Sequence, residues 1–287
     1  MAPDRLFNLG FDLATTISIL ALVSLGLAVI FGMRGVINLA HGEFIMLGAF
    51  ATLTGVRNGL NIWIAMAAAA AVVGLFGIVV ERLIIRHLYG RLADTMLATW
   101  GLSLIMVQAV ENRYGSVTEG ISVPVGNFTV GEFSMSKYNF VLIAAAAASV
   151  LATYATMRRT RYGLLARAAT QSSTMAEGLG VNTSGVNMWT FGLGSALAGA
   201  AGALLAPVVG VIPTMGQTFV ARAFMTVIVG GPSFVAGTVS ASGLLGFIEN
   251  VGTNWFTPVI GQAMLLMAAI VILRFLPQGL TGTRFRR

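Results

Sequence analysis

Long apolar runs separated by short polar segments make up most of this chain. Most of the runs hold about 20 predominantly apolar residues, the length of a helix that crosses the hydrocarbon layer of a bilayer. We expect such helices over 11–31, 36–56, 61–80, 94–111, 139–157, 187–209, 233–252 and 257–275. The pattern therefore predicts an all-α, polytopic membrane protein with about eight to nine transmembrane or partly re-entrant helices.

One apolar segment, 219–231, is shorter than the others. It begins after Pro213 and Gly216 and ends at Gly230-Gly231-Pro232. At 1.5 Å per residue it reaches only about 20 Å, whereas the hydrocarbon core is about 30 Å thick. A broken helix survives in a membrane only where protein or a watery cavity satisfies its backbone, and such helices often line transport sites. The alternative is a full span whose ends the pattern hides.

A faint internal echo accompanies this segment. Gly35-Val36-Ile37 lies near the start of the second span, and Gly210-Val211-Ile212 follows the sixth. The predicted topology puts the two triplets on opposite faces of the membrane, as an inverted repeat requires. Three residues in a chain rich in glycine, valine and isoleucine are also expected to recur by chance.

Composition supports one membrane domain over 1–287. Apolar residues are 56% of the chain and charged residues only 9%, whereas a soluble domain carries roughly 25% charged residues. Cysteine is absent and there are two histidines, so we expect no metal centre, no catalytic residue and no cofactor. The net charge of +7 does not indicate nucleic-acid binding, because the arginines lie at span ends.

The basic residues also set the orientation. Cytoplasmic loops of membrane proteins carry an excess of lysine and arginine. With the N-terminus outside, most of the 17 basic residues fall on the cytoplasmic side, which includes the C-terminal Arg284, Arg286 and Arg287. The polar stretch 112–138 then faces outward, where its glycines suit turns or a short hairpin. The basic segment 158–186 faces the cytoplasm.

Three polar residues interrupt the second apolar run. Asn38, His41 and Glu43 lie within a few residues of one another, and a charge at the centre of a membrane helix costs about 2.5–3.5 kcal/mol. One interpretation is a polar lining of a translocation pathway or a gate. The other is a buried hydrogen-bonded cluster that fixes helix packing. An intramembrane enzyme is disfavoured, because His41 and Glu43 at i and i+2 point to different helix faces.

Further pathway candidates are three glutamines, Gln108, Gln217 and Gln262. An amide side chain can bind a polar solute, but it can equally join two helices. Glu249 and Asn250 sit near the predicted outer end of their span, and we favour an interfacial pair over a solute contact there.

The 158–186 segment carries apolar residues at helical spacing. It predicts a short amphipathic helix outside the membrane, which fits either a groove on a partner or the lipid headgroups. The chain has no phosphate-binding G-x-x-x-x-G-K-[ST] motif, and its only lysine is Lys137. Any transport driven by ATP therefore requires another subunit.

Four stretches, in this order and spacing, resemble one known family. They are Gly35-Val36-Ile37-Asn38-Leu39-Ala40-His41-Gly42-Glu43-Phe44, Arg161-Tyr162-Gly163 through Leu179-Gly180-Val181, Phe191-Gly192-Leu193-Gly194-Ser195-Ala196-Leu197-Ala198-Gly199, and Arg274-Phe275-Leu276-Pro277-Gln278-Gly279-Leu280. The family is the inner-membrane permease subunits of ATP-binding cassette importers for branched-chain amino acids, with their relatives that import urea and short-chain amides.

The resemblance implies a set of partners in the bacterial inner membrane. They are a homologous second permease, two ATPase subunits and an extracytoplasmic solute-binding protein, with membrane lipid around the permeases. The second stretch corresponds to the segment that contacts the ATPase. The resemblance assigns that coupling role to Arg161, Gly163, Arg167, Ala168, Ala169, Glu177, Gly178 and Gly180.

The solute is less well specified by the residues. The stretches 97–104, 215–217 and 223–225 look more like the urea and amide branch. They favour urea or a short-chain amide as the solute, with branched-chain amino acids as the alternative. A stand-alone urea or amide channel is a further alternative, since a small neutral solute can cross through a size-selective pore.

Overall fold

The computed structural model describes residues 3–131 and 133–282, so the C-terminal arginines from Arg284 onward lie outside the described residues. The helices are α1 (Pro3–Arg34), α2 (His41–Arg57), α3 (Ile62–Leu83), the 3-10 helix η1 (Ile85–Leu88), α4 (Leu92–Tyr114), α5 (Tyr138–Arg159), α6 (Arg161–Gln171), α7 (Ser173–Gly178), α8 (Thr183–Val209), α9 (Met215–Gly230), α10 (Phe234–Trp255) and α11 (Pro258–Phe275). Strands β1 (Asn127–Val130) and β2 (Phe133–Ser136) pair as an antiparallel hairpin.

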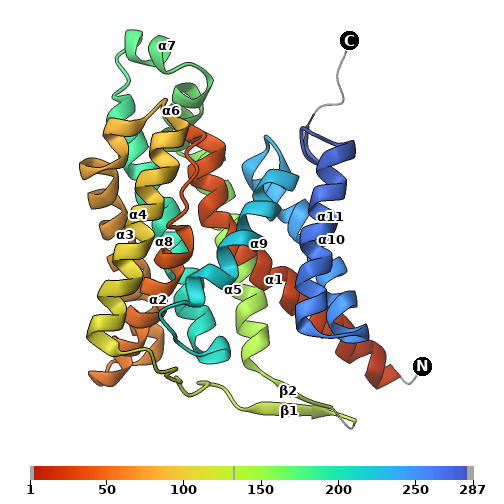
Figure 1. Ribbon diagram of the computed structural model, residues 1–287. Coiled ribbons are helices and arrows are strands. Elements are labelled where there is room, and N and C mark those ends of the chain that lie inside the picture. The colour runs from red at the N-terminus through yellow and green to blue at the C-terminus, as the bar shows by residue number, and fades with distance from the viewer. Residues whose placement is uncertain (1–2, 132, 283–287) are drawn as a thin grey trace.

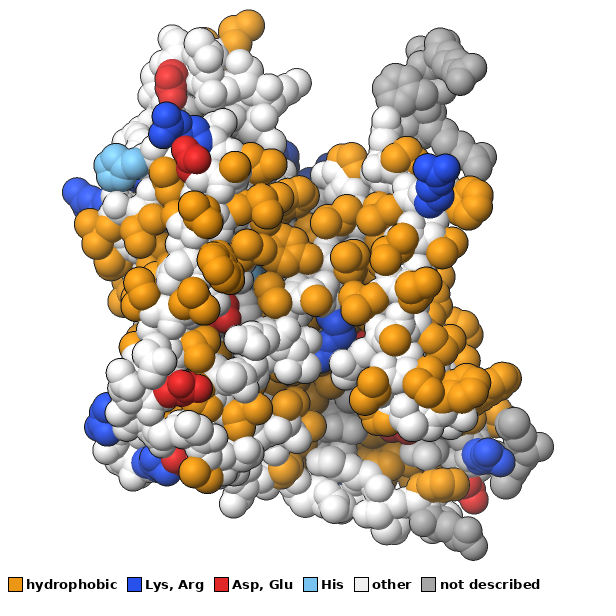
Figure 2. All heavy atoms as spheres, viewed as in Figure 1, with side chains coloured by type: hydrophobic (Ala, Val, Ile, Leu, Met, Phe, Trp, Pro, Cys, Tyr) orange, Lys and Arg blue, Asp and Glu red, His pale blue; other side chains and the backbone are white. Residues whose placement is uncertain are grey.

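The predicted fold class is confirmed. Among the described residues, seven helices are long and apolar enough to cross a membrane, and α9 is a shorter apolar helix. Hydrophobic side chains cover the middle of the molecule, and most charged side chains lie toward its two ends (Figure 2). The protein is therefore a polytopic, all-α membrane protein, and the hairpin lies within the 112–138 stretch where the glycines predicted turns.

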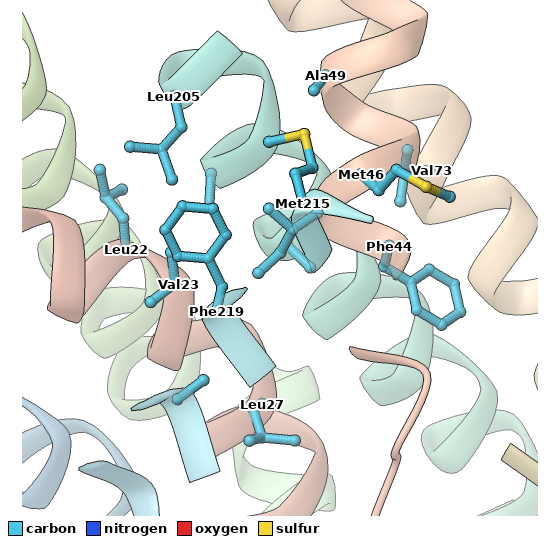
Figure 3. Packing of buried hydrophobic residues seen from close by; sticks show 14 of the residues in the cluster. Leu22, Val23, Leu27, Phe44, Met46, Ala49, Val73, Leu205, Met215 and Phe219 are labelled. Carbon is cyan, nitrogen blue, oxygen red and sulfur yellow. The ribbon is translucent and has the colours of Figure 1, made fainter. Parts of the chain in front are cut away.

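Helix α8 lies at the centre of the bundle, against α1, α2 and α3. Small residues allow this, because a Cβ at Gly194 would meet the α1 carbonyl oxygen of Gly26, and one at Gly199 would meet Val73 of α3. Close backbone approach of this kind drives helix association where lipid supplies no hydrophobic force. Figure 3 shows the core beside it, where Leu22 of α1 and Phe219 of α9 lie near Leu205 of α8.

The two ends of the bundle differ. Helices α6 and α7 and the last turn of α11 lie at one end, while the start of α1 and the β1–β2 hairpin lie at the other (Figure 1). The sequence predicted the same pairing of segments, with 158–186 opposite 112–138. The assignment of the α6–α7 end to the cytoplasm remains a prediction.

The predicted second span is helical only in part. A helix was predicted over 36–56, but residues 35–38 are not helical, 39–40 form a turn, and α2 begins at His41. The chain leaves α1 through Gly35, whose φ of +61° is accessible to glycine at little cost. The apolar side chains of Val36, Ile37 and Leu39 concealed this break, because hydropathy does not distinguish extended from helical backbone.

A second break of the same form follows α8. Gly210 has a φ of +79°, and Val211 pairs with Glu119 in an isolated antiparallel bridge before α9 begins. The starts of α2 and α9 touch, since a Cβ on Gly42 or Gly216 would overlap the backbone of the other. From this contact α9 runs toward the end that holds 276–282, and α2 runs toward the end that holds Glu119. The Gly-Val-Ile echo therefore marks equivalent breaks of opposite direction.

Candidate solute pathway and coupling surface

The break before α2 is held by side chains of α4 and of the break itself. The Leu39 N–H donates to Thr99 Oγ1 at 3.1 Å, and the Ala40 N–H donates to Asn38 Oδ1 at 3.1 Å. Backbone groups freed from a helix inside a membrane must find partners in the protein. Thr99 and Asn38 supply partners for two of these groups, the N–H groups of Leu39 and Ala40.

His41 is fully buried at the first position of α2. Its Nε2 lies 2.8 Å from the carbonyl oxygen of Val23 in the middle of α1. Because a carbonyl only accepts, Nε2 carries the proton in this contact, and Nδ1 is left as an acceptor with no partner among the described residues. His41 thus ties the start of α2 to α1.

Glu43 completes this cluster. Its side chain is buried and interacts with the Ser103 hydroxyl of α4. Asn38, His41 and Glu43 are all buried near the start of α2, but each side chain has a different partner: the Ala40 N–H, the Val23 carbonyl of α1 and Ser103 of α4. No cavity described below is lined by any of them. In this conformation the contacts of these residues can fix the broken helices in place.

A second polar site lies between α9, α10 and α11. Arg222 Nη1 donates to Glu249 Oε1 at 2.8 Å, and both side chains are largely buried. The pair lines a cavity of about 190 Å³ that Gln262 also lines. The sequence interpretation placed Glu249 and Asn250 together near the outer end of their span and named no partner for the carboxylate, which the structure pairs with Arg222. The sequence analysis did not single out Arg222, although a charge in the middle of a short apolar segment is a signal that could have found it.

The other two glutamines are not brought to either site. Gln108 is exposed on α4, where its Nε2 donates to Asn112 Oδ1 one turn further on the same helix. Gln217 is exposed in the first turn of α9. Of the three predicted glutamines, Gln262 is the one that lines a cavity described here, the cavity beside Arg222 and Glu249.

The 158–186 segment folds as two short helices with well-defined starts. Thr160 Oγ1 accepts from the Gly163 N–H at 3.1 Å and begins α6, and Ser172 Oγ accepts from the Met175 N–H at 3.3 Å and begins α7. Threonine and serine are preferred at this position because their oxygen satisfies a free N–H of the first turn. The single amphipathic helix predicted here is thus a pair, α6 and α7.

Helix α6 is fastened to the membrane helices. Arg167 Nη1 donates to the Met157 carbonyl of α5 at 2.6 Å, and Thr170 Oγ1 donates to the Met33 carbonyl of α1 at 3.0 Å. The Tyr162 hydroxyl lies 2.7 Å from Thr190 Oγ1 of α8. Burial raises the pKa of the Tyr162 phenol, and the Thr190 contact offsets this in part, so the phenol stays protonated and able to donate.

The residues predicted to couple to an ATPase fall into two groups, one buried and one exposed to solvent. Gly163 and Ala169 are buried against the bundle and position α6. Those exposed at the end of the molecule are Arg161, Arg167, Ala168, Glu177, Gly178 and Gly180. Beside them Met175 and Leu179 are 73% and 84% exposed. Exposed apolar side chains grouped on a polar surface are typical of a protein-binding site.

A cavity of about 860 Å³ opens at this same end. It lies between the end of α1, the α6–α7 junction, the end of α9 and the segment after α11. The segment after α11 closes one side, because the Leu280 N–H donates to the Val229 carbonyl at 2.7 Å and Thr281 Oγ1 donates to Gly230. The coupling helices therefore line one wall of a hollow that the end of α9 also lines.

Two broken helices, α2 and α9, meet inside the membrane bundle, and the short helices α6 and α7 cover one end of it. This is the architecture of a transport permease. The chain belongs to the family described as branched-chain amino acid transport system / permease component, which matches residues 10–274. It is an importer permease subunit of the ATP-binding cassette class within that family.

Relatives of similar length support this membership. The chain is 30% identical to the high-affinity branched-chain amino acid transport system permease protein BraD of Pseudomonas aeruginosa over 280 residues, which is 91% of each chain. It is 27% identical to the corresponding permease protein LivH of Escherichia coli over 304 residues, covering 97% of this chain and 95% of the relative. The probable LivH of Methanocaldococcus jannaschii is 24% identical over 290 residues. No solved structure matches the chain.

Proposed function

We propose that this chain forms half of the translocation pathway of an ATP-driven importer for branched-chain amino acids. The observation that carries the proposal is similarity over nearly the whole chain to permeases named for that solute class. The urea or short-chain amide solute that the sequence favoured has no support in these relatives, so the alternative becomes the main proposal.

The proposed assembly contains four kinds of subunit. A homologous permease completes the pathway, two ATPases bind at the α6–α7 end, and an extracytoplasmic protein delivers the solute at the hairpin end. Exposed apolar side chains on α6 and α7 support the ATPase contact, and the chain has no phosphate-binding motif with which to bind ATP itself. The orientation follows, with the α6–α7 end and the C-terminus in the cytoplasm.

Solute uptake tests the proposed function directly. Cells that carry the complete importer and lack their other leucine transporters should take up labelled leucine, and deletion of this gene should lower uptake to the background level. Labelled urea should enter equally with and without the gene. Gene-dependent uptake of urea without uptake of leucine would contradict the proposed solute.

Single cysteines test the orientation and the ATPase contact together. The chain has no cysteine, so Gly178→Cys on α7 and Gly126→Cys before the hairpin each introduce one thiol at an exposed position with nothing within 4 Å of the new Cβ. A membrane-impermeant thiol reagent should label Gly126→Cys and spare Gly178→Cys in spheroplasts. In inverted vesicles Gly178→Cys alone should crosslink to an ATPase subunit. Labelling of Gly178→Cys from outside would reverse the orientation.

A further inference from the structure

The Arg222–Glu249 pair keeps part of its hydrogen-bonding capacity unused. Arg222 Nη1 donates to Glu249 Oε1 at 2.8 Å and Nε donates to the Thr218 carbonyl at 3.3 Å, while the guanidinium carbon lies 4.9 Å from the centre of the Phe219 ring. Arg222 Nη2 and Glu249 Oε2 have no hydrogen-bond partner in the described part of the chain. The Nη2 donor group and the Oε2 acceptor, which carry opposite charges, therefore remain available for another partner.

The pair is fixed in place by the helices around it. Gly252 of α10 and Gly261 of α11 lie so close that a Cβ on Gly252 would come within 2.8 Å of the Gly261 Cα. Asn250 Nδ2 lies 3.4 Å from Thr16 Oγ1 and links α10 to α1. These contacts hold the first turns of α11 and the middle of α1 on either side of Glu249, which preorganises the site.

The cavity beside the pair is amphipathic. From α1 it is lined by Ile19, Leu20 and Val23, one aliphatic stripe at helical spacing, with Thr16 one turn earlier. The remaining lining residues are Thr253, Pro258 and Gln262, together with the charged pair. A volume of about 190 Å³ has room for a small solute and not for a peptide.

We propose that this cavity is a subsite for a zwitterionic α-amino acid with an aliphatic side chain. The inference rests on the proposed function and names the groups that select the solute. The α-carboxylate takes the Nη2 donor of Arg222, the α-ammonium takes the Oε2 acceptor of Glu249, and the side chain lies along Ile19, Leu20 and Val23. Charged groups inside a membrane bundle are typical of solute pathways, since they are costly wherever they have no function.

A neutral solute fits this site less well than a zwitterion. Urea brings no charge to Arg222 Nη2 or Glu249 Oε2, and it leaves the aliphatic stripe without a partner. An amino acid places a carboxylate against the guanidinium and an ammonium against the carboxylate, so each contact is a charge-assisted hydrogen bond. The site therefore distinguishes the solute classes between which the sequence alone could not decide.

A structural ion pair and a solute site respond differently to an apolar replacement. Replacing both members of a buried ion pair by apolar residues of similar volume often preserves or raises stability. The double variant Arg222→Met, Glu249→Leu should therefore keep the bundle folded while removing both charges. The matched control is Arg91→Gln with Asp94→Asn, which removes an exposed pair 3.3 Å apart at the start of α4.

The test uses the complete importer, with its ATPases and binding protein, in proteoliposomes. We expect the double variant to assemble with its partners as wild type does, and leucine-loaded binding protein to stimulate its ATP hydrolysis. Labelled leucine import should fall by roughly tenfold or more, and the control should match wild type. Leucine import close to wild type in the assembled double variant would overturn the proposal.

A second variant serves if the double variant does not assemble. Ile19→Phe adds bulk on the aliphatic stripe and leaves the ion pair in place, so it should lower leucine import severalfold relative to alanine import. An unchanged leucine-to-alanine ratio would contradict the placement of the side chain. A different result would contradict the proposed function itself: a wild-type complex that imports urea and does not import leucine.

Discussion

Gly202→Val is expected to remove nearly all folded permease from the membrane. Gly202 of α8 packs directly on α2, where a Cβ would lie 2.6 Å from the carbonyl carbon and 3.1 Å from the Cα of Ile45, and closer still to the Ile45 oxygen. Backbone cannot yield as a flexible side chain can. Overpacking a well-packed core costs about 1–3 kcal/mol and occasionally more, and total stabilities are only about 5–15 kcal/mol. Valine adds two methyl groups beyond the Cβ at this contact, so its cost in stability should exceed the usual range of about 1–3 kcal/mol.

Gly243→Val provides the matched control for this effect. Gly243 also lies within a long helix, α10, but a Cβ there has no heavy atom within 4 Å. Any effect from helix propensity is shared by the two variants and is below about 1 kcal/mol. The amount of detergent-extracted permease and its unfolding temperature should fall sharply for Gly202→Val and change little for Gly243→Val. Equal losses would show that close packing of α8 on α2 is not what stabilises the bundle.

Hydropathy predicted most of this fold because membrane spans are defined by length and polarity. The helix predicted over 187–209 is Thr183–Val209, and that predicted over 257–275 is Pro258–Phe275. The start of the second span was wrong because Gly35 ends α1 through a left-handed turn, which a run of apolar residues does not reveal. A broken helix was one of the two interpretations of 219–231, because Pro213 and the glycines around the segment are visible in the sequence, and α9 is a short apolar helix.

The polar sites were predictable only when their residues are close in the chain. Asn38, His41 and Glu43 stand together in one apolar run, and the structure buries all three near the start of α2. Arg222 and Glu249 come from different helices, so their pairing depends on how α9 packs against α10. That packing is set by the small residues Gly230 and Gly237, whose backbones touch, and pairing between helices cannot be read from one helix at a time.

The solute could not be predicted from the stretches that suggested urea. Thr99, in the 97–104 stretch, accepts from the backbone of the break before α2. Met215 and Gly216 begin α9 against Gly42 and belong to the packed interior. These residues hold the broken helices in place, a requirement that does not depend on what is transported. The residues proposed to select the solute lie elsewhere, on α1, α9 and α10.

Arg167→Met is expected to uncouple ATP hydrolysis from transport. The last carbonyls of a helix have no partner within it, and Arg167 Nη1 satisfies that of Met157 in the last turn of α5 at 2.6 Å. A hydrogen bond with a charged member contributes about 1.5–3 kcal/mol, which corresponds to a change of at least about tenfold in the population of docked α6. Methionine keeps the apolar stem of the side chain and removes only the donor.

The ratio of leucine imported to ATP hydrolysed measures this coupling. If the ATPases act through α6, a loosely held α6 transmits less of their movement to α5 and α1, so the ratio should fall by about tenfold while ATP hydrolysis continues. The control is Arg82→Met, an exposed arginine in the last turn of α3, which should leave the ratio at its wild-type value. A normal ratio in Arg167→Met would mean that the remaining ties of α6, from Thr170 to α1 and from Tyr162 to α8, transmit the movement without α5. A loss of both hydrolysis and import would instead place Arg167 in the ATPase contact itself.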